Sequence, residues 1–252
     1  MILAIDIGNT NVSLGVVRGR VVLTEVHIDG RLSQIAFKRK LAGVSYSLRK
    51  KYPQLEKVVM CSVVPGKTKM IESLIERNLN KKVLKIRREI GVPIKNNYSR
   101  PQQVGEDRLV GAYAAKTLYG APAIVVDFGT AITFDVISTK GEYEGGLIVP
   151  GIGMSLESLS SKTALLPEIR KVKIPKNLVG KNTRESILSG IFNGYGALCS
   201  GLIEKLSKAM GRRPSIVLTG GYAHLMRKFI SHSYPCRVDR HLIFKGLALL
   251  VN

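Results

Sequence analysis

The sequence has no tryptophan, and Phe, Tyr and Trp together make up only 6% of its residues. Proteins that bind single-stranded nucleic acid commonly stack the bases on aromatic side chains. Basic residues outnumber acidic ones by 39 to 18, giving a formal net charge of +21. A field of this sign attracts polyanions, including nucleotide phosphates. Because the basic residues are not accompanied by aromatic residues that could stack on bases, we expect nucleic acid to bind only through non-specific charge attraction.

Cysteines and long apolar runs are also scarce. Cys61, Cys199 and Cys236 lie far apart and lack metal-ligand spacing, and an odd number argues against a disulfide framework. A reducing cytoplasm is therefore the expected compartment. No run of about 18 apolar residues occurs, so we expect no membrane span. Residues 1–6 lack the charged region of a secretory signal and are typical of a strand instead.

Apolar strand patterns alternate with helical patterns along the chain, which indicates an α/β protein. Strands are expected at 2–5, 12–17, 21–27, 58–64, 83–86, 123–126, 133–137, 146–149 and 215–219. Helices are expected at 31–52, 67–80, 109–118, 154–163 and 183–210, and residues 91–107 and 164–182 are expected to be irregular. Four glycines interrupt the helix at 183–210, and such small residues can mark the close approach of another helix.

The opening pattern occurs twice. Residues 3–9 and 124–130 both consist of an apolar strand followed by Asp, an apolar residue, Gly and a polar residue. Asp6 and Asp127 are 127 − 6 = 121 positions apart, about half the chain. Each copy is followed by a strand, a turn and another strand, so duplication explains the match better than coincidence. We therefore predict two related domains, at 1–115 and 116–252, and leave open whether the last helix packs on the first domain.

The first copy, residues 6–11, has the chemistry of a phosphate-binding hairpin. Gly8 lets the backbone approach a phosphate, and successive N–H groups in such a turn can form an anion-binding nest. Asp6 at the strand end is suited to holding the Mg²⁺ that accompanies ATP. The pattern differs from the Walker loop, which has a Lys and leads into a helix. The alternative interpretation is an ordinary polar β-turn, which uses the same residue types.

The second copy has the same chemistry. Asp127 could coordinate a cation, and the Thr130 hydroxyl could donate to a phosphate oxygen. Gly220 and Gly221 follow a strand and would leave room for a base or ribose, although a strand-to-helix turn uses the same residues. Two such hairpins could hold a triphosphate from opposite sides.

Phosphoryl transfer to an alcohol also needs a group that accepts the hydroxyl proton, and a carboxylate does this well. Of the six aspartates, Asp107 is the best remaining candidate because it precedes a helix in an irregular segment. Arg108 beside it could bind a carboxylate in fork geometry. The alternative is an Asp–Arg surface pair at a helix start. Thr183 could face an acidic ligand at a helix N-terminus, although Asn182 and Glu185 resemble a capping box.

Taken together, these residues resemble the type III pantothenate kinases of the acetate kinase/sugar kinase/Hsp70/actin superfamily. The resemblance covers nearly the whole chain, and the stretch 105–108 is its most specific part. The matching stretches are 6–11, 105–108, 127–131, 145–146 with 150–151, 182–183 and 219–221. The resemblance implies duplicated actin-like (ribonuclease H-like) domains with a nucleotide cleft between them. It also implies ATP-dependent phosphorylation of the primary hydroxyl of pantothenate, the first step of coenzyme A synthesis.

The resemblance further implies residue roles. Asp107 would be the catalytic base, and Asp127 would bind a monovalent cation, potassium or ammonium. The implied ATP contacts are Asp6, Ile7, Gly8, Asn9, Thr10, Asn11, Val12, Ser13 and Thr130. The implied pantothenate contacts are Tyr98, Gly105, Glu106, Asp107, Arg108 and Thr183. The family is typically a homodimer.

Residues 238–242 depart from the family's usual pattern, and we interpret that end as structural. Two alternatives stay open. One is a transcriptional regulator like the Bvg accessory factors, which belong to the same family, binding nucleic acid on this scaffold. The other is a superfamily kinase for a different hydroxyl acceptor. The basic charge favours the nucleic-acid-binding regulator, whereas the presence of Asp6, Asp107 and Asp127 together favours a kinase.

Overall fold

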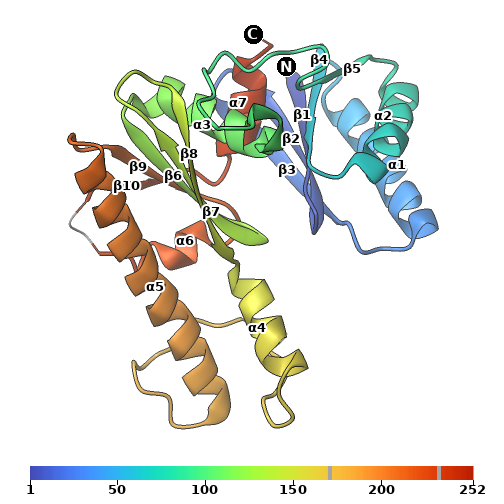
Figure 1. The fold of residues 1–252 in the computed structure, drawn as a ribbon. Helices are drawn as coiled ribbons and strands as arrows, with labels where there is room; N and C mark the ends of the chain where they lie inside the picture. The colour runs from blue at the N-terminus through green and yellow to red at the C-terminus, as the bar shows by residue number, and fades with distance from the viewer. Residues whose placement is uncertain (170–171, 232–233, 252) are drawn as a thin grey trace. The chain divides into compact units, whose positions relative to one another are not determined.

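The computed structural model describes residues 1–169, 172–231 and 234–251, and the chain forms two compact units (Figure 1). The first unit comprises Met1–Ile94, Tyr98–Thr117 and His241–Asn252. The second comprises Lys95–Asn97 and Leu118–Arg240. The end of the chain thus returns to the first unit.

The first unit is built on a five-stranded sheet with the order β3-β2-β1-β4-β5. Its strands are β1 (Ile2–Ile7), β2 (Asn11–Arg18), β3 (Val21–Asp29), β4 (Lys57–Ser62) and β5 (Val83–Lys85). The first three strands pair antiparallel, whereas β4 pairs parallel with both β1 and β5. Both faces are covered, which explains why β1 and β4 are apolar runs without polar alternation.

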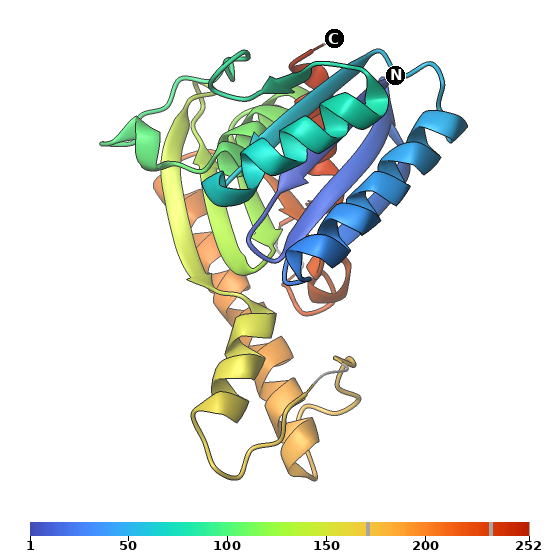
Figure 2. The same cartoon turned by 90° about the vertical axis from the view of Figure 1, so that its right-hand side faces the viewer.

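Helices pack on both faces of this sheet. One face is covered by α1 (Gln34–Lys51) and α2 (Pro65–Leu79), as Figure 2 shows, and their apolar side chains join Leu3, Ile5 and Ile7 in one core. The other face carries Ile2, Ala4 and Cys61 in a core shared with α7 (Leu242–Leu249) and Val110 of α3 (Glu106–Tyr119). Because side chains alternate along a strand, Asp6 follows Ile2 and Ala4 on this second face.

The second unit contains another five-stranded sheet, with the order β10-β9-β6-β7-β8. Its strands are β6 (Ala123–Phe128), β7 (Ala131–Ile137), β8 (Tyr143–Pro150), β9 (Ser215–Thr219) and β10 (Cys236–Val238). The antiparallel pairs are β6 with β7 and β7 with β8, whereas β9 is parallel to β6 and to β10.

The described part of the second unit contains three helices: α4 (Ile152–Ser161), α5 (Thr183–Ala209) and α6 (Ala223–Met226). In Figures 1 and 2, α4 and α5 lie side by side, and the Ser155 Oγ and Tyr195 Oη atoms are 2.6 Å apart. By length and composition alone, α5 could cross a membrane. This is weak evidence, because core helices pass the same test, and Leu188, Phe192 and Cys199 of α5 lie in the unit's core.

The two sheets are copies of one another. Their strands correspond one to one in order and direction, with β1 matching β6 and β4 matching β9. Even an irregularity repeats: the register shifts by one residue between Val16 and Val17 of β2, and between Val136 and Ile137 of β7. A β-bulge at equivalent positions in both units is the expected result of duplication, since bulges are retained within families.

Two local expectations need correction. The helix α3 begins at Glu106, so Asp107 lies in its first turn and not in an irregular segment before it. Within α5, only Gly196 meets a close neighbour: a Cβ there would lie 2.4 Å from the Phe229 carbonyl oxygen. Positions 190, 194 and 201 have open space around them within the chain. The glycines therefore mark a close approach at one position out of four.

Candidate functional site

The turn between β1 and β2 is a tight hairpin with exposed polar side chains. The Gly8 amide donates to the Asn11 carbonyl oxygen at 3.0 Å, and the Gly30 amide donates to the Thr10 carbonyl oxygen at 2.7 Å. Asn9 and Asn11 are exposed at its tip. The backbone of residues 8–11 is therefore fixed from two sides, which is the preorganisation that an anion-binding turn requires.

A row of four polar side chains runs across the first sheet next to this turn. Asp6 on β1 lies directly opposite Cys61 on β4 and Ser13 on β2, and Ser13 lies opposite His27 on β3. Because opposite residues in paired strands share a face, all four side chains lie on the face that carries α7. The Ser13 hydroxyl and His27 Nδ1 are 2.9 Å apart.

Asp6 has unusual electrostatics. Burial, followed by the negative charge of Asp107, raises the pKa of the Asp6 carboxyl to about 7. The Cys61 thiol donates to Asp6 Oδ1 at 3.4 Å, which opposes that rise. Burial also raises the pKa of the Cys61 thiol, so this cysteine is a neutral donor and not a thiolate. A cation beside Asp6 would favour its charged form.

Asp107 comes to the same region from α3. Its Oδ1 accepts the Arg108 backbone N–H at 2.8 Å. Burial raises the pKa of this carboxyl, as expected where water is excluded. A Cβ at Gly105 would lie 2.4 Å from Asp107 Oδ1. Glycine therefore leaves the space that the carboxylate occupies.

Glu106 fastens the start of α3 to the end of β4. Its Oε2 accepts the Ser62 backbone N–H at 2.9 Å, and burial raises the pKa of its carboxyl. This hydrogen bond fixes the first turn of α3 and so positions Asp107, the next residue along the chain. Arg108 and Tyr98 are both partly buried in the same unit.

In the second unit, Asp127 occupies the position that matches Asp6. It lies opposite Thr133 on β7 and Thr219 on β9. Gly220 has φ +87°, and a Cβ there would lie 2.2 Å from Asp127 Oδ1. Only glycine fits this left-handed position so close to a carboxylate.

Thr130 lies in the turn that follows β6, and its side chain is exposed. The backbone of this turn is closely packed, since a Cβ at Gly151 would lie 2.0 Å from the Thr130 carbonyl oxygen. Gly151 therefore allows β8 to continue into α4 directly against the turn. The sequence comparison of the two hairpins gave no sign of this contact.

Thr183 begins α5 and is exposed. The expected cap is present: Asn182 Oδ1 accepts the Glu185 backbone N–H at 2.9 Å, and Glu185 Oε2 accepts the Lys181 N–H at 3.0 Å. The capping interpretation of Asn182 and Glu185 is therefore confirmed. The Thr183 side chain takes no part in these two capping hydrogen bonds.

The described residues hold no cluster of metal-ligating side chains. No group of three or more His, Cys, Asp or Glu side chains there could hold a metal ion. Mg²⁺ in phosphoryl-transfer enzymes commonly takes only one or two carboxylates, together with water and substrate phosphates. A single, partly buried carboxylate such as Asp6 therefore fits Mg²⁺ that arrives with a nucleotide. Asp127, with hydroxyl residues opposite it on both neighbouring strands, fits a cation that prefers oxygen ligands.

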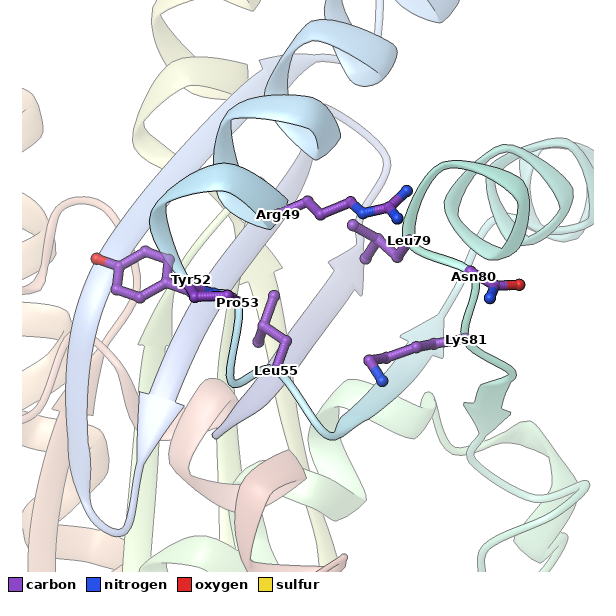
Figure 3. A pocket seen from close by; sticks show the side chains of 7 residues that line it. All are labelled: Arg49, Tyr52, Pro53, Leu55, Leu79, Asn80 and Lys81. Carbon is purple, nitrogen blue, oxygen red and sulfur yellow. The ribbon is translucent and has the colours of Figure 1, made fainter.

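A cavity of about 250 Å³ lies elsewhere in the first unit (Figure 3). It is lined by Arg49, Tyr52, Pro53, Leu55, Leu79, Asn80 and Lys81, none of which is a predicted site residue. Leu55 precedes β4, so this cavity is at the opposite end of the sheet from the turn after β1. Its cations lie where two helices end, and Arg49 donates to the Asn78 carbonyl oxygen at 3.0 Å. Basic residues at helix C-termini offset the helix dipole, which explains them without a ligand.

The chain is similar in sequence to known proteins over nearly its whole length. The family model "Type III pantothenate kinase" matches residues 2–205. A type III pantothenate kinase of Persephonella marina is 44% identical, over 98% of this chain and 96% of that protein. This chain belongs to the type III pantothenate kinase family. Another member, from Sulfurihydrogenibium sp., is 37% identical over 99% of both chains.

Solved structures support the fold. The ethanolamine utilization protein EutJ of Carboxydothermus hydrogenoformans matches with a TM-score of 0.56 and 15% identity, over 98% of this chain and 89% of that one. A protein of Sinorhizobium meliloti described as a putative 2-dehydro-3-deoxygalactonokinase has the same TM-score and identity, over 99% and 98%. At this identity the likeness shows the fold alone. The predicted α/β class with duplicated actin-like domains is confirmed.

For this family member, the structure groups the site residues that belong to the first unit. Asp107 lies near both Asp6 and Glu106, because its negative charge contributes to the raised pKa of each of these carboxyls. Thr130, Asp127 and Thr183 belong to the second unit and are described within it. Sequence reasoning missed His27, and it considered Cys61 only as a metal ligand or disulfide partner. Only strand pairing reveals them, because both are far from Asp6 along the chain.

Proposed function

We propose that this chain transfers the γ-phosphoryl group of ATP to the primary hydroxyl of pantothenate, giving 4′-phosphopantothenate at the start of coenzyme A biosynthesis. One observation carries the proposal: in a type III pantothenate kinase chain, a partly buried carboxylate with a raised pKa, Asp107, lies beside the Asp6 hairpin. Membership of the family makes the chain an ATP-dependent kinase that uses a divalent metal. The residue roles below are part of the proposal.

Asp107 is the proposed general base. Its carboxylate accepts the proton of the pantothenate hydroxyl as the oxygen bonds to the γ-phosphorus and the bond from that phosphorus to the ADP oxygen breaks. A base is most effective when its pKa lies near the working pH. Burial moves the pKa of Asp107 in that direction, and the Arg108 N–H on Oδ1 fixes the orientation of the carboxylate.

In the first unit, the proposed ATP contacts are residues 6–13, with Asp6 holding the Mg²⁺ that accompanies ATP. The fixed turn at 8–11 and its exposed asparagines support this role. Mg²⁺ would neutralise charge on the phosphates and on Asp6 together. In the second unit, the exposed Thr130 is the proposed phosphate contact.

The proposed pantothenate contacts are Tyr98, Gly105, Glu106, Arg108 and Thr183, besides Asp107. Arg108 is suited to the pantothenate carboxylate, because a guanidinium can bind a carboxylate through two parallel hydrogen bonds. For Gly105 and Glu106 the geometry adds a second role, since both place Asp107. Asp127 is the proposed ligand of a monovalent cation, K⁺ or NH₄⁺.

We also propose a cytoplasmic homodimer. Three large apolar side chains are exposed on the connection between α4 and α5: Leu165 at 91%, Leu178 at 73% and Val179 at 65%. Exposed apolar side chains of this size are available to the surface of a second protomer. Light scattering on the purified protein should give twice the chain mass, and a monomer at all concentrations would contradict this part of the proposal.

The activity is tested with purified protein, ATP, Mg²⁺ and a panel of acceptors: pantothenate, sugars and other hydroxy acids. ADP release should depend on pantothenate and rise on addition of K⁺ or NH₄⁺ over Na⁺. Turnover of a sugar or another hydroxy acid, but not of pantothenate, would reassign the chain to a different acceptor. An Asp127→Asn variant that keeps the full cation response would remove Asp127 from the cation site.

A further inference from the structure

We infer that His27, held by Glu25, is a positioning residue that orients the Ser13 hydroxyl toward nucleotide phosphate. This inference rests on the proposed function, which places Ser13 among the ATP contacts. Neither His27 nor Glu25 belongs to the residues that the family resemblance implies. Both lie on β3, on the same face as Asp6.

Four side chains form a chain of polar contacts. Ser13 Oγ lies 2.9 Å from His27 Nδ1, and His27 Nε2 lies 3.3 Å from Glu25 Oε1. The second oxygen of Glu25 lies 3.2 Å from His241 Nε2, at the start of α7. Glu25 is only 16% exposed, compared with 50% for His27. The carboxylate is therefore fixed from two sides, and it fixes the His27 ring.

The ring orientation decides what the Ser13 hydroxyl can do. A carboxylate facing Nε2 requires that this nitrogen carry a proton. When the ring is neutral, the Nδ1 lone pair accepts a hydrogen bond from the Ser13 hydroxyl. When the ring is charged, Nδ1–H donates to Ser13 Oγ, and the hydroxyl proton is left to donate to another acceptor. An anionic phosphate beside Ser13 favours this second arrangement.

The duplicated unit shows that the fold does not require this pair. The residue of β8 opposite Thr133, which matches His27, is Ile148, and Gly146 matches Glu25. In that unit the Thr133 hydroxyl donates to Asp135 on its own strand at 3.1 Å. The same sheet with the same bulge therefore forms without a histidine or a carboxylate at these positions. The His27–Glu25 pair is an addition on the proposed nucleotide side of the first unit.

A double-mutant cycle with Ser13 tests the inference. We expect His27→Ala to raise KM for ATP roughly 3- to 10-fold, the size expected for one hydrogen bond, with KM for pantothenate unchanged. His27→Asn should recover most of the loss, because its amide nitrogen lies near the position of Nδ1 and can donate to Ser13. In a Ser13→Ala background, His27→Ala should have no further effect, since residues that act through one contact are not additive.

Three results would overturn the inference: an unchanged KM for ATP in His27→Ala, the full effect persisting in the Ser13→Ala background, or equal changes in both KM values with a lower melting temperature. Calorimetric titration of the same variants with a non-hydrolysable ATP analogue gives the same cycle without turnover. If the unsubstituted protein fails to phosphorylate pantothenate, the proposed function falls. The titration then still decides whether His27 acts through Ser13.

Discussion

The two units have the same sheet, but the side chains in matching positions of that sheet differ in chemistry. In the first unit, the row across the four neighbouring strands is Cys61, Asp6, Ser13 and His27. In the second unit, the matching row is Thr219, Asp127, Thr133 and Ile148. Only the aspartate at the end of the first strand is common to both. The duplication therefore preserves one carboxylate, and the residues around it have diverged.

The surroundings of each aspartate indicate a division of roles. Near Asp6 are the carboxyl of Asp107, the thiol of Cys61 and the ring of His27, and the pKa of Asp6 is raised to about 7. Near Asp127 are two threonines and a glycine that only just clears its oxygen. Proton transfer needs titratable groups whose pKa is tuned, whereas binding needs fixed oxygens and backbone. We therefore propose that the first unit carries the acid–base step in addition to its nucleotide contacts, and that Asp127 in the second unit serves binding alone.

The largest effect expected from this division is on Asp107. Asp107→Asn keeps the size and the backbone contact but cannot accept a proton, so kcat should fall by about 10²–10⁴-fold. Affinity for ATP, measured by calorimetry, should change little. Near-normal turnover in this variant would remove the acid–base role from the first unit.

The second unit should respond to changes of shape. Gly220→Ala places a methyl group 2.2 Å from Asp127 Oδ1 at φ +87°, and the strained backbone alone costs about 1–3 kcal/mol. The melting temperature should fall, and KM should change more than kcat. Gly221→Ala is the matched control, because a Cβ there has open space. Equal stability of the two variants would show that the contact with Asp127 is not tight.

A smaller effect is expected where Gly151 meets the Thr130 turn. Gly151→Ala would place a Cβ 2.0 Å from the Thr130 carbonyl oxygen, and overpacking of this kind costs about 1–3 kcal/mol. Because the turn must move, KM for ATP should rise. Gly153→Ala, two residues later with no neighbour within 4 Å, should behave like the unsubstituted protein. An unchanged KM in Gly151→Ala would argue against Thr130 as a phosphate contact.

A pH dependence of stability also belongs to the first unit. The pKa of Asp6 is about 7 in the folded protein, compared with 3.8 for a free side chain. Between these values the folded state binds the extra proton, so the free energy of unfolding should fall as pH rises from about 4 to 7. One proton accounts for at most about 1.4 kcal/mol per pH unit.

Denaturant unfolding of the free protein, without Mg²⁺ or nucleotide, measures this slope. Asp6→Asn should make it shallower but not abolish it, because burial also raises the pKa of Asp107. Asp29→Asn is the control, since Arg31 lowers the pKa of Asp29 and places its titration below this window. An unchanged slope in Asp6→Asn would contradict the electrostatic difference between the units.

The sequence predicted the architecture because duplication leaves a readable pattern. Strand, Asp, Gly and polar turn recur at Asp6 and Asp127, and the alternation of strands and helices gives the α/β class. The glycines of the two turns and Asp107 could be identified by residue type. What could not be predicted is which strand residues face one another across the first sheet.

His27 illustrates the physical reason. Counting back from the turn between Arg18 and Val21 would pair Ser13 with Val26, on the opposite face of β3. The bulge at Val16 and Val17 shifts the register by one residue, so His27 lies opposite Ser13. A one-residue shift exchanges the two faces of a strand. No sequence pattern in residues 16–24 indicates this shift. Cys61 is similarly hidden, because β4 reaches β1 only through a parallel crossover.

The central claim is that this chain phosphorylates the primary hydroxyl of pantothenate, and the identity of the product tests it most directly. Purified protein should be incubated with ATP, Mg²⁺, K⁺ and pantothenate, and the product examined by proton-coupled ³¹P NMR. A phosphate ester of the primary hydroxyl couples to two methylene protons and should give a triplet. A doublet from the secondary hydroxyl, or inorganic phosphate as the only product, would contradict the account.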